Sequence, residues 1–440
     1  MRMYDVIDKK KKGEELTEEE IRYAIEGYVK EEIPDYQISA LLMAIYYQGM
    51  TDQELLVLTN CMAESGDMVD LSGIHGIKVD KHSTGGVGDK TTLVVAPLVA
   101  ACGGMVAKMS GRGLGFTGGT IDKLEAIPGF QTAVPQKEFF DTVNKIGLSV
   151  IGQSGQIAPA DKKLYALRDV TATVDSIPLI AASIMSKKLA SGSDKIVLDV
   201  TVGSGAFMKK VEDAVELAEK MVAIGEGAGR ETIAIITNMD VPLGVAVGND
   251  LEVVEAIKTL QGNGPEDFKE ICIEFAAYML YLGEIAALEE CKAMVIEALN
   301  NGKAIEKLIQ MVEYQKGDSS YVQDVKKFTP AKFQLDYIME EDGYITHMDT
   351  EICGKTSVVL GAGRETKESE IDFKAGIKFY HKTGEYIEKG TVLATLYASD
   401  ETKLQNGLSC LKTAYTFGQE KVEAMKAIIA HVSKNGVIYA

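Results

Sequence analysis

Residues 79–92 read "VDKHSTGGVGDKTT" and place Gly85, Gly86 and Gly88 among Lys, His, Ser, Thr and Asp side chains. The apolar run "TTLVVAPLVAA" follows directly. Glycines let the backbone turn tightly and present N–H groups to a ligand, and the N-terminus of a following helix attracts anions. The stretch therefore predicts a phosphate-binding turn in front of a buried helix or strand.

Two common nucleotide-binding loops do not fit this turn. A nucleoside triphosphate loop has Gly directly before Lys-Ser/Thr, whereas Asp89 stands between Gly88 and Lys90 and would repel a triphosphate. The GxGxxG pattern of a dinucleotide-binding loop is also missing here. The turn is therefore expected to bind a smaller anion.

A second glycine-rich stretch, "KMSGRGLGFTGGTIDKLE", repeats the pattern with Lys108, Ser110 and Thr120 among five glycines. Residues 81–130 hold 11 of the 43 glycines and five bases against three acids, although the chain as a whole has a net charge of −19. Two such turns that converge would surround one tetrahedral anion with donors. Further along this stretch, Asp122 and Glu125 are expected to pair with Arg112 or with loop amides rather than to bind a metal.

A third stretch, "LYALRDVTATVDSIPLIAASIMSKKLA", brings cations into an apolar setting. Ser183 and Lys187 are four residues apart on a predicted helix and therefore project from one face. With Arg168, they suit a planar ligand rich in carbonyl groups. An alternative remains open, in which the Arg and Lys side chains pair with Asp169 and Asp175.

Composition limits the class of protein. The 440 residues are 46% hydrophobic and 25% charged, which is typical of a globular enzyme of two or three domains. The net charge argues against binding to nucleic acid or anionic membranes, no apolar run is long enough for a membrane span, and the N-terminal residues lack the apolar stretch of a secretory signal. The six cysteines are scattered, which predicts reduced thiols in a cytoplasmic protein and no zinc site.

The pattern of elements predicts an α/β fold with three parts. Helical segments, with capping boxes at Thr17–Glu20 and Thr51–Glu54, predict a discontinuous helical domain. Alternating β-rich and helical segments predict a large α/β phosphate-binding domain around a central mixed sheet. Short strands with Gly turns predict a C-terminal α+β domain that resembles half of a biotinyl or lipoyl carrier, without the carrier's Met-Lys pair. The expected ranges are 1–66 and 160–192, 77–155 and 195–335, and 336–440.

The motifs together resemble one enzyme family. "SGRGLGFTGGTIDKLE" fits the signature of the thymidine and pyrimidine-nucleoside phosphorylases, and "KHSTGGVGDK", "RDVTATVDSIPLIAASIMSKKLA" and "DVPLGVAVGNDLEVVEAI" are similar to that family in the expected order. The resemblance spans essentially the whole chain and is closest to the pyrimidine-nucleoside branch. It implies a homodimer with the active site in a cleft between the helical and α/β domains, and it implies that the helical domain mediates dimerisation and base binding.

The resemblance also implies roles for matched positions. The implied phosphate ligands are Lys81, His82, Ser83, Thr92, Lys108, Ser110 and Thr120. The implied substrate-binding residues are Arg168, Ser183, Lys187, Tyr165, Leu114 and Lys108, and the implied catalytic residues are His82, Arg168 and Lys187. A monovalent-cation site, expected to hold potassium mainly on main-chain oxygens, matches Gly88, Lys90, Leu243, Ala246 and Glu255. Phe116 stands where many relatives have His, which predicts altered pocket edges rather than lost activity.

The implied reaction is phosphorolysis of a pyrimidine nucleoside, with inorganic phosphate as co-substrate and no organic cofactor. Relatives restricted to thymidine tend to have Met at position 108, so Lys108 predicts activity on uridine and deoxyuridine as well as thymidine. A thymidine-restricted phosphorylase remains an alternative. So do an anthranilate-type phosphoribosyltransferase, which needs magnesium, and a non-catalytic nucleoside-binding protein.

Overall fold

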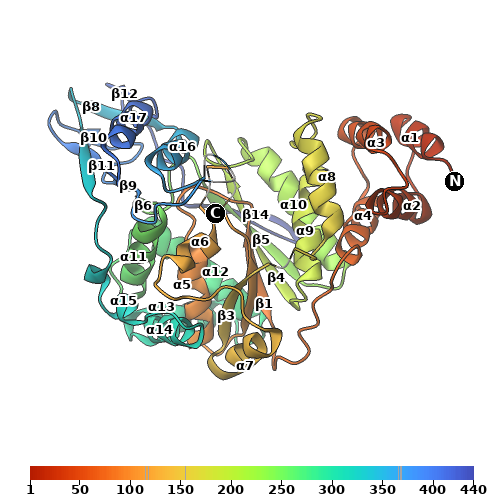
Figure 1. Cartoon of the computed structure of the whole chain (residues 1–440), viewed down its shortest axis with the longest axis horizontal. Helices are drawn as coiled ribbons and strands as arrows, with labels where there is room; N and C mark the ends of the chain where they lie inside the picture. Colours follow the sequence, from red (N-terminus) through yellow and green to blue (C-terminus); the bar gives the residue numbers. More distant parts are fainter. Residues whose placement is uncertain (114, 117, 154, 365, 367–368) are drawn as a thin grey trace.

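The computed structural model describes residues 1–440 except 114, 117, 154, 365, 367 and 368 (Figure 1). The first four helices are α1 (Met3–Lys11), α2 (Glu18–Val29), α3 (Asp35–Gln48) and α4 (Asp52–Glu64). Both predicted capping boxes are confirmed: Thr17 and Glu20 cap α2, and Thr51 and Glu54 cap α4. The first four residues of a helix lack intrahelical acceptors for their N–H groups, so these boxes determine where the helices begin.

The central sheet has five strands in the order β1-β4-β5-β13-β14. The strands are β1 (Val79–Ser83), β4 (Lys195–Val202), β5 (Thr232–Asn238), β13 (Ile428–Ser433) and β14 (Gly436–Tyr439). The first three are parallel, whereas β13 and β14 run antiparallel to their neighbours. The predicted mixed sheet is therefore confirmed. A separate parallel pair, β2 (Val106–Ser110) and β3 (Leu148–Gly152), lies beside β1.

Helices cover this sheet and form two large hydrophobic clusters. One cluster is built on α5 (Thr91–Ala101), α11 (Asn249–Leu260), α12 (Glu266–Leu282), α13 (Leu288–Asn300) and α14 (Lys303–Tyr314). The other joins α1–α4 to α8 (Pro159–Asp169), α9 (Ile177–Ala190) and α10 (Val211–Gly227). Shorter or peripheral helices are α6 (Thr120–Glu125), α7 (Gln136–Ile146), α15 (Ser320–Gln323) and the 3-10 helix Val325–Lys327. In Figure 1, α8 and α9 lie between the N-terminal helices and the central sheet.

The C-terminal part is a third cluster of small sheets and two helices. Its elements are β7 (Phe333–Ile338), β8 (Gly343–Met348), α16 (Thr350–Leu360), β9 (Gly376–Phe379), β10 (Tyr386–Ile387), β11 (Val392–Ala398), α17 (Glu401–Lys412) and β12 (Tyr415–Gly418). The short strand β6 (Ala246–Val247), from the α/β part, pairs with β9.

The structure corrects the predicted boundary of the C-terminal domain. The range 336–440 was expected to be one domain, but β13 and β14 leave it and extend the central sheet. Pairing of Ala430 with Ile236 and of Val432 with Ala234 covers the outer edge of β5. A bare edge would expose unpaired backbone groups, and the end of the chain satisfies them.

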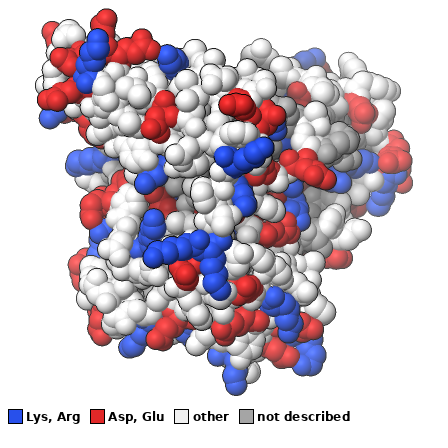
Figure 2. All heavy atoms as spheres, turned by 60° about the vertical axis from the view of Figure 1, so that its left-hand side comes forward, with Lys and Arg blue, Asp and Glu red and all other residues white. Residues whose placement is uncertain are grey.

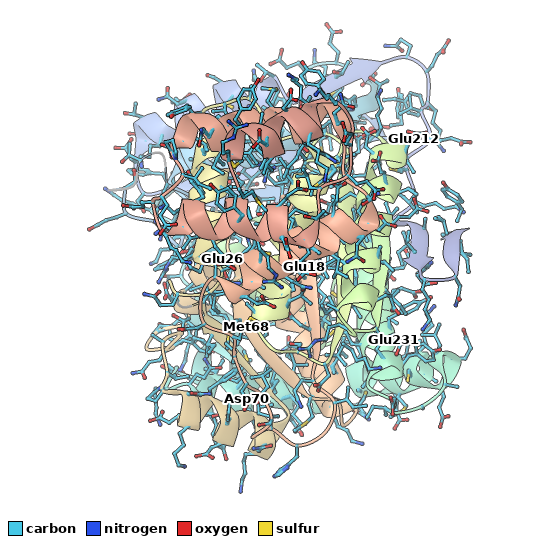
Figure 3. All side chains as sticks on the ribbon, turned by 90° about the vertical axis from the view of Figure 1, so that its right-hand side faces the viewer. Glu18, Glu26, Met68, Asp70, Glu212 and Glu231 are labelled. Carbon is cyan, nitrogen blue, oxygen red and sulfur yellow. The ribbon has the colours of Figure 1, made fainter. Side chains whose placement is uncertain are left out.

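The face of the molecule in Figure 2 carries side chains of both charges. Figure 2 shows acidic and basic side chains interspersed over one face. Figure 3 views the molecule from the side of the N-terminal helices, where Glu18 and Glu26 of α2 are exposed and Met68 and Asp70 mark the segment between α4 and β1. Among the residues described, no helix has the length and apolar content to cross a bilayer.

Candidate functional site

The first glycine-rich turn connects the carboxyl end of β1 to the N-terminus of α5, as expected for an anion-binding turn. Gly85 and Gly88 have φ of +103° and +77°, which residues with a Cβ rarely adopt. The backbone N–H of Gly85 donates to Ser83 Oγ at 3.1 Å. Thr92 is the second residue of α5 and only 8% exposed. The apolar run "TTLVVAPLVAA", for which the sequence allowed a helix or a strand, forms helix α5.

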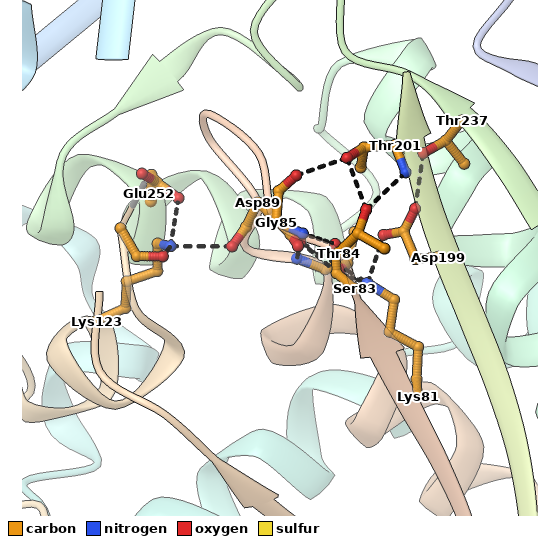
Figure 4. Close-up of polar contacts among 12 residues, drawn as sticks. Lys81, Ser83, Thr84, Gly85, Asp89, Lys123, Asp199, Thr201, Thr237 and Glu252 are labelled. Atoms are coloured by element: carbon orange, nitrogen blue, oxygen red, sulfur yellow. Dashed lines mark hydrogen bonds and ion pairs between the residues drawn. The ribbon is translucent and has the colours of Figure 1, made fainter. Parts of the chain in front are cut away.

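Lys81 lies under this turn in a buried polar network (Figure 4). Its ammonium donates to Asp199 Oδ2 at 2.7 Å and to Thr91 Oγ1 at 2.6 Å. Asp199 in turn accepts from Thr237. An ammonium has three hydrogens, so two of them already have partners within the protein. Lys81 therefore holds the turn on the sheet, and its assignment as a phosphate ligand stays a prediction.

Asp80 is the centre of a second buried cluster, which sequence reasoning missed. Its Oδ1 accepts from Lys108 Nζ at 3.1 Å, and its Oδ2 accepts from Lys188 Nζ at 2.8 Å. Lys108 also donates to the carbonyl of Lys81. Burial lowers the pKa of Lys108 to about 8, although the charge of Asp80 opposes this shift. One carboxylate thus joins β1, β2 and α9.

His82 lies beside this cluster at the end of β1 and is half-buried. Burial and the positive charges of Lys188 and Lys108 hold its pKa well below the usual range. Lys187 acts in the same direction, and Asp80 acts against it. The imidazole is therefore neutral at pH 7 and offers a neutral N–H donor rather than an imidazolium. A neutral imidazole can donate one hydrogen bond to a ligand, and the assignment of His82 as a catalytic residue stays a prediction.

The second glycine-rich turn places Ser110 at the end of β2 and Thr120 at the start of α6. The prediction for the acidic pair is confirmed. Arg112 donates to Asp122 Oδ1 at 3.0 Å and to Glu125 at 2.6 and 2.8 Å. The amide of residue 113 donates to Asp122 Oδ2 at 2.7 Å.

Two side chains attach this turn to the C-terminal part. Arg364 Nη2 donates to Asp122 Oδ1 at 3.2 Å. Phe116 packs against the third hydrophobic cluster, and a Cβ at Gly354 of α16 would lie 2.9 Å from its ring. The aromatic side chain at position 116 therefore has a packing role. Leu114, implied to line the pocket, lies outside the described residues.

Arg168, near the end of α8, is 3% exposed and organises the segment that leads into α9. Its guanidinium donates to the carbonyls of Thr173 at 3.1 Å, Val174 at 2.6 Å and Leu179 at 3.1 Å. The alternative pairing with Asp169 or Asp175 is not what these contacts show. Burial lowers the pKa of Arg168, yet a guanidinium stays charged at any pH a protein tolerates. These three bonds use three of the five N–H groups of the guanidinium, and two are left for other acceptors.

Lys187 and Ser183 lie on one face of α9, as their spacing predicted. Lys187 Nζ donates to Asp161 Oδ2 at 2.6 Å and lies 3.3 Å from Ser183 Oγ. The carboxylate partner is thus Asp161 of α8 and not Asp175. The side chain of Lys187 is 29% exposed. Tyr165 is half-buried on α8, with its ring centroid 5.9 Å from the Arg168 guanidinium carbon.

The positions implied for a monovalent cation do converge, but the residues present do not fit a potassium ion there. The ammonium of Lys90 itself donates to Leu243 O at 2.7 Å and Ala246 O at 3.0 Å, and it pairs with the Glu255 carboxylate. An ammonium donates hydrogen bonds and has no lone pair for a metal. A second cation on the same oxygens would meet its positive charge in a dry site.

The three predicted stretches therefore meet through residues that sequence reasoning did not single out: Asp80, Asp161, Lys188 and Asp199. Asp80 and Lys188 are each adjacent to an assigned position, and Asp199 lies inside a buried apolar run, whereas Asp161 has neither signal. A charged residue inside a buried run is the signal that could have identified Asp199, because burial of a charge requires a partner.

A cavity of about 500 Å³ lies elsewhere, between the end of β5 and the C-terminal part. Asp240, His347 and Lys382 are among its lining residues. Of the predicted site residues that the structure describes, Leu243 alone lines it. This cavity is therefore distinct from the Asp80 cluster.

Comparison with known proteins identifies the family. Residues 75–305 match the a/b domain of a glycosyl transferase family, and residues 4–66 match its helical bundle domain. Residues 344–418 match the pyrimidine nucleoside phosphorylase C-terminal domain. The anthranilate phosphoribosyltransferase of Thermus thermophilus has a similar structure, with a TM-score of 0.57 at 19% identity, over 71% of this chain and 100% of that one. At that identity the likeness concerns the fold alone.

Curated relatives are much closer in sequence. The pyrimidine-nucleoside phosphorylases of Geobacillus stearothermophilus and Bacillus subtilis (strain 168) are each 56% identical over 402 residues, which covers 91% of this chain and 93% of each relative. That of Staphylococcus epidermidis (strain ATCC 12228 / FDA PCI 1200) is 55% identical over 400 residues, with 91% and 92% covered. The chain therefore belongs to this glycosyl transferase family, in the branch of the pyrimidine-nucleoside phosphorylases, and is a pentosyltransferase.

Proposed function

We propose that this enzyme catalyses the reversible phosphorolysis of uridine, thymidine and deoxyuridine, giving the free base and the α-(deoxy)ribose 1-phosphate. The observation that carries the proposal is a cluster of three ammonium groups, on Lys108, Lys187 and Lys188, that share two carboxylates, Asp80 and Asp161. In a chain of net charge −19, such a group favours a reaction that brings in an anion and releases another.

The two glycine-rich turns are the proposed phosphate site. An oxygen of the phosphate attacks the anomeric carbon, and the bond from that carbon to N1 of the pyrimidine breaks with its electron pair moving to the base. Attack opposite the leaving base inverts the configuration and gives the α-phosphate. As in glycoside hydrolysis, positive charge develops on the sugar in the transition state.

The departing pyrimidine becomes anionic, and the proposed role of Lys187 and Arg168 is to bind that charge. The neutral N–H of His82 donates to a carbonyl oxygen of the base. These contacts are stronger for the anion than for the neutral nucleoside, which is the condition for accelerating the chemical step. Asp161 is a positioning residue in this scheme because it holds Lys187 at 2.6 Å.

Lys108 is proposed to favour ribose. Two of its ammonium hydrogens have partners in Asp80 and the Lys81 carbonyl. The third can donate to phosphate or to a ribose 2′-OH, which a Met at this position cannot do.

A second copy of the chain is the proposed partner, as the family resemblance implies. Exposed tyrosines on two adjacent helices support this surface: Tyr4 on α1 is 67% exposed, and Tyr36 and Tyr47 on α3 are 72% and 76% exposed. Tyrosine is enriched at interfaces because it combines apolar area with a polar tip.

The test is incubation of the purified protein with uridine or thymidine, with and without inorganic phosphate. We expect base and sugar 1-phosphate to form only with phosphate, and nucleoside to form from uracil and ribose 1-phosphate. Anthranilate with phosphoribosyl pyrophosphate and magnesium is the comparison substrate set. Turnover of that set, or release of base without phosphate, would contradict the proposal.

A further inference from the structure

Lys90 occupies a cage of oxygens at the end of the first glycine-rich turn. Its ammonium contacts the carbonyls of Leu243 and Ala246 at 2.7 and 3.0 Å and the carboxylate of Glu255. Glu255 is held in place by the backbone N–H groups of Val245 at 3.0 Å and Ala246 at 3.3 Å. The cage therefore offers one negative charge and two carbonyl dipoles to a single positive charge.

The cage is closed to water. Lys90 has no exposed surface, and its ammonium lies 5.0 Å from the centroid of the Phe268 ring, a favourable distance for a cation over an aromatic face. Gly244 has φ of +67°, and a Cβ there would lie 2.9 Å from Lys90 Nζ. A side chain at position 244 would therefore clash with the ammonium and with the Glu255 carboxylate.

These oxygens belong to the positions that the family resemblance implies for a monovalent cation. Ammonium and potassium carry the same charge and are similar in size. We propose that the ammonium of Lys90 takes the place of that cation, so that this enzyme carries its own tethered cation and needs no potassium for stability or turnover.

The tether has a structural consequence for the phosphate turn. Lys90 is the residue immediately before α5, and its backbone N–H donates to Gly88 O at 3.0 Å. Two bonds join the turn to the segment before β6. Leu243 N donates to Val87 O at 3.0 Å, and Lys90 Nζ donates to Leu243 O. Because the ammonium cannot dissociate, the shape of the turn does not depend on an ion in solution, whereas a bound ion would stabilise only in proportion to its concentration.

The experiment compares the wild type with Lys90→Thr in KCl, NaCl and choline chloride at equal ionic strength. Threonine removes the ammonium, leaves space, and adds a hydroxyl oxygen to the cage. We expect one Tm and one phosphorolysis rate for the wild type in all three salts. Lys90→Thr should have a lower Tm in choline chloride, and its Tm should rise with KCl concentration to a plateau.

Lys10→Thr is the matched control. Lys10 is also buried on a carboxylate, Glu54, at 2.8 and 2.9 Å, but on the N-terminal helices. This variant should lose stability without specific recovery in KCl. A wild type whose Tm or rate rises saturably and specifically with potassium would overturn the proposal, and so would a folded Lys90→Thr indifferent to potassium. If Lys90→Thr does not fold, the wild-type comparison alone decides. The Tm readout needs no turnover, so its outcome is separate from that of the proposed function.

Discussion

The carboxylate of Asp80 accepts a hydrogen bond from the ammonium of Lys188 at 2.8 Å and so joins strand β1 to helix α9. The same carboxylate holds Lys108 of β2 through its other oxygen. The elements that carry the proposed phosphate turns and the proposed base-binding lysine are thus linked through one buried anion. The position of the proposed phosphate turns relative to the proposed base-binding lysine therefore depends on the Asp80 carboxylate.

Asp80→Asn should therefore destabilise the fold as well as reduce activity. The change leaves two buried ammonium groups without their charged partner, and breaking a buried ion pair costs about 3–5 kcal/mol. Urea denaturation followed by circular dichroism measures this loss. Asp8→Asn is the control, since Asp8 also pairs with two lysines, Lys11 and Lys12, but its side chain is 27% exposed. It should show no measurable change, and equal losses in the two variants would contradict the role given to Asp80.

His82→Ala should lower kcat/KM by about 10- to 100-fold, corresponding to the loss of one hydrogen bond to a charged group. His82→Asn, which keeps an N–H donor, should retain more activity. Loss of a proton donor would instead cost about 10²- to 10⁴-fold and would affect both variants alike. Steady-state rates at pH 7 separate the two roles.

His82 should also weaken the fold in mild acid. The pKa of His82 is lowered in the folded protein, whereas the pKa of a His in the unfolded chain is about 6.5. Below that pH the unfolded chain binds a proton that the folded protein does not bind, so the stability of the fold decreases. Tm measured from pH 7 to pH 5 should decline less steeply in His82→Gln than in the wild type. The same change at His75, which lies on an exposed loop, should leave the wild-type slope intact.

Lys108 should produce a basic limb in the pH profile. With its pKa near 8, the ammonium loses its proton as the pH rises through that value, and kcat/KM should fall because the neutral amine no longer attracts phosphate. Lys108→Arg should shift the limb to higher pH, and Lys108→Met should lack it and lose uridine activity more than thymidine activity. Ionisation of the nucleoside is common to all three proteins, so the differences report on Lys108. A methionine variant with wild-type preference would contradict the ribose contact.

Lys187→Ala should reduce kcat by about 10²- to 10³-fold, the typical cost of removing one donor from a site of developing negative charge. The side chain is 29% exposed, so Tm should change little by comparison. Lys163→Ala is the control and should turn over like the wild type, because the Lys163 ammonium pairs with Glu31 and donates to the carbonyl of Tyr28 of α2. A Lys187→Ala variant with full turnover would remove Lys187 from the mechanism.

Tyr36→Glu combined with Tyr47→Glu should convert the proposed dimer to a monomer, because the two copies would bury four carboxylates without partners at the interface. Sedimentation velocity measures the mass in solution. Tyr386→Glu places the same charge on an exposed tyrosine of β10 and should leave the dimer intact. A wild type that sediments as a monomer would contradict the assigned partner.

Short-range features of this protein could be read from its sequence. The capping boxes at Thr17 and Thr51 depend on groups three residues apart, and such contacts form whatever surrounds the helix. The turn at Gly85–Gly88 and the shared face of Ser183 and Lys187 follow from local backbone geometry in the same way. The fold class followed from the order of such segments.

Only the tertiary structure decided where the long charged side chains end. Lys90 reaches a cage contributed by residues about 150 positions away, as its bonds to Leu243 and Ala246 show. The last strands likewise join the central sheet because the edge of β5 is open, which no local pattern at residues 428–439 reveals. The physical reason is common to both cases: a buried charge or a bare strand edge must find a partner, and the sequence states the need without stating which distant segment meets it.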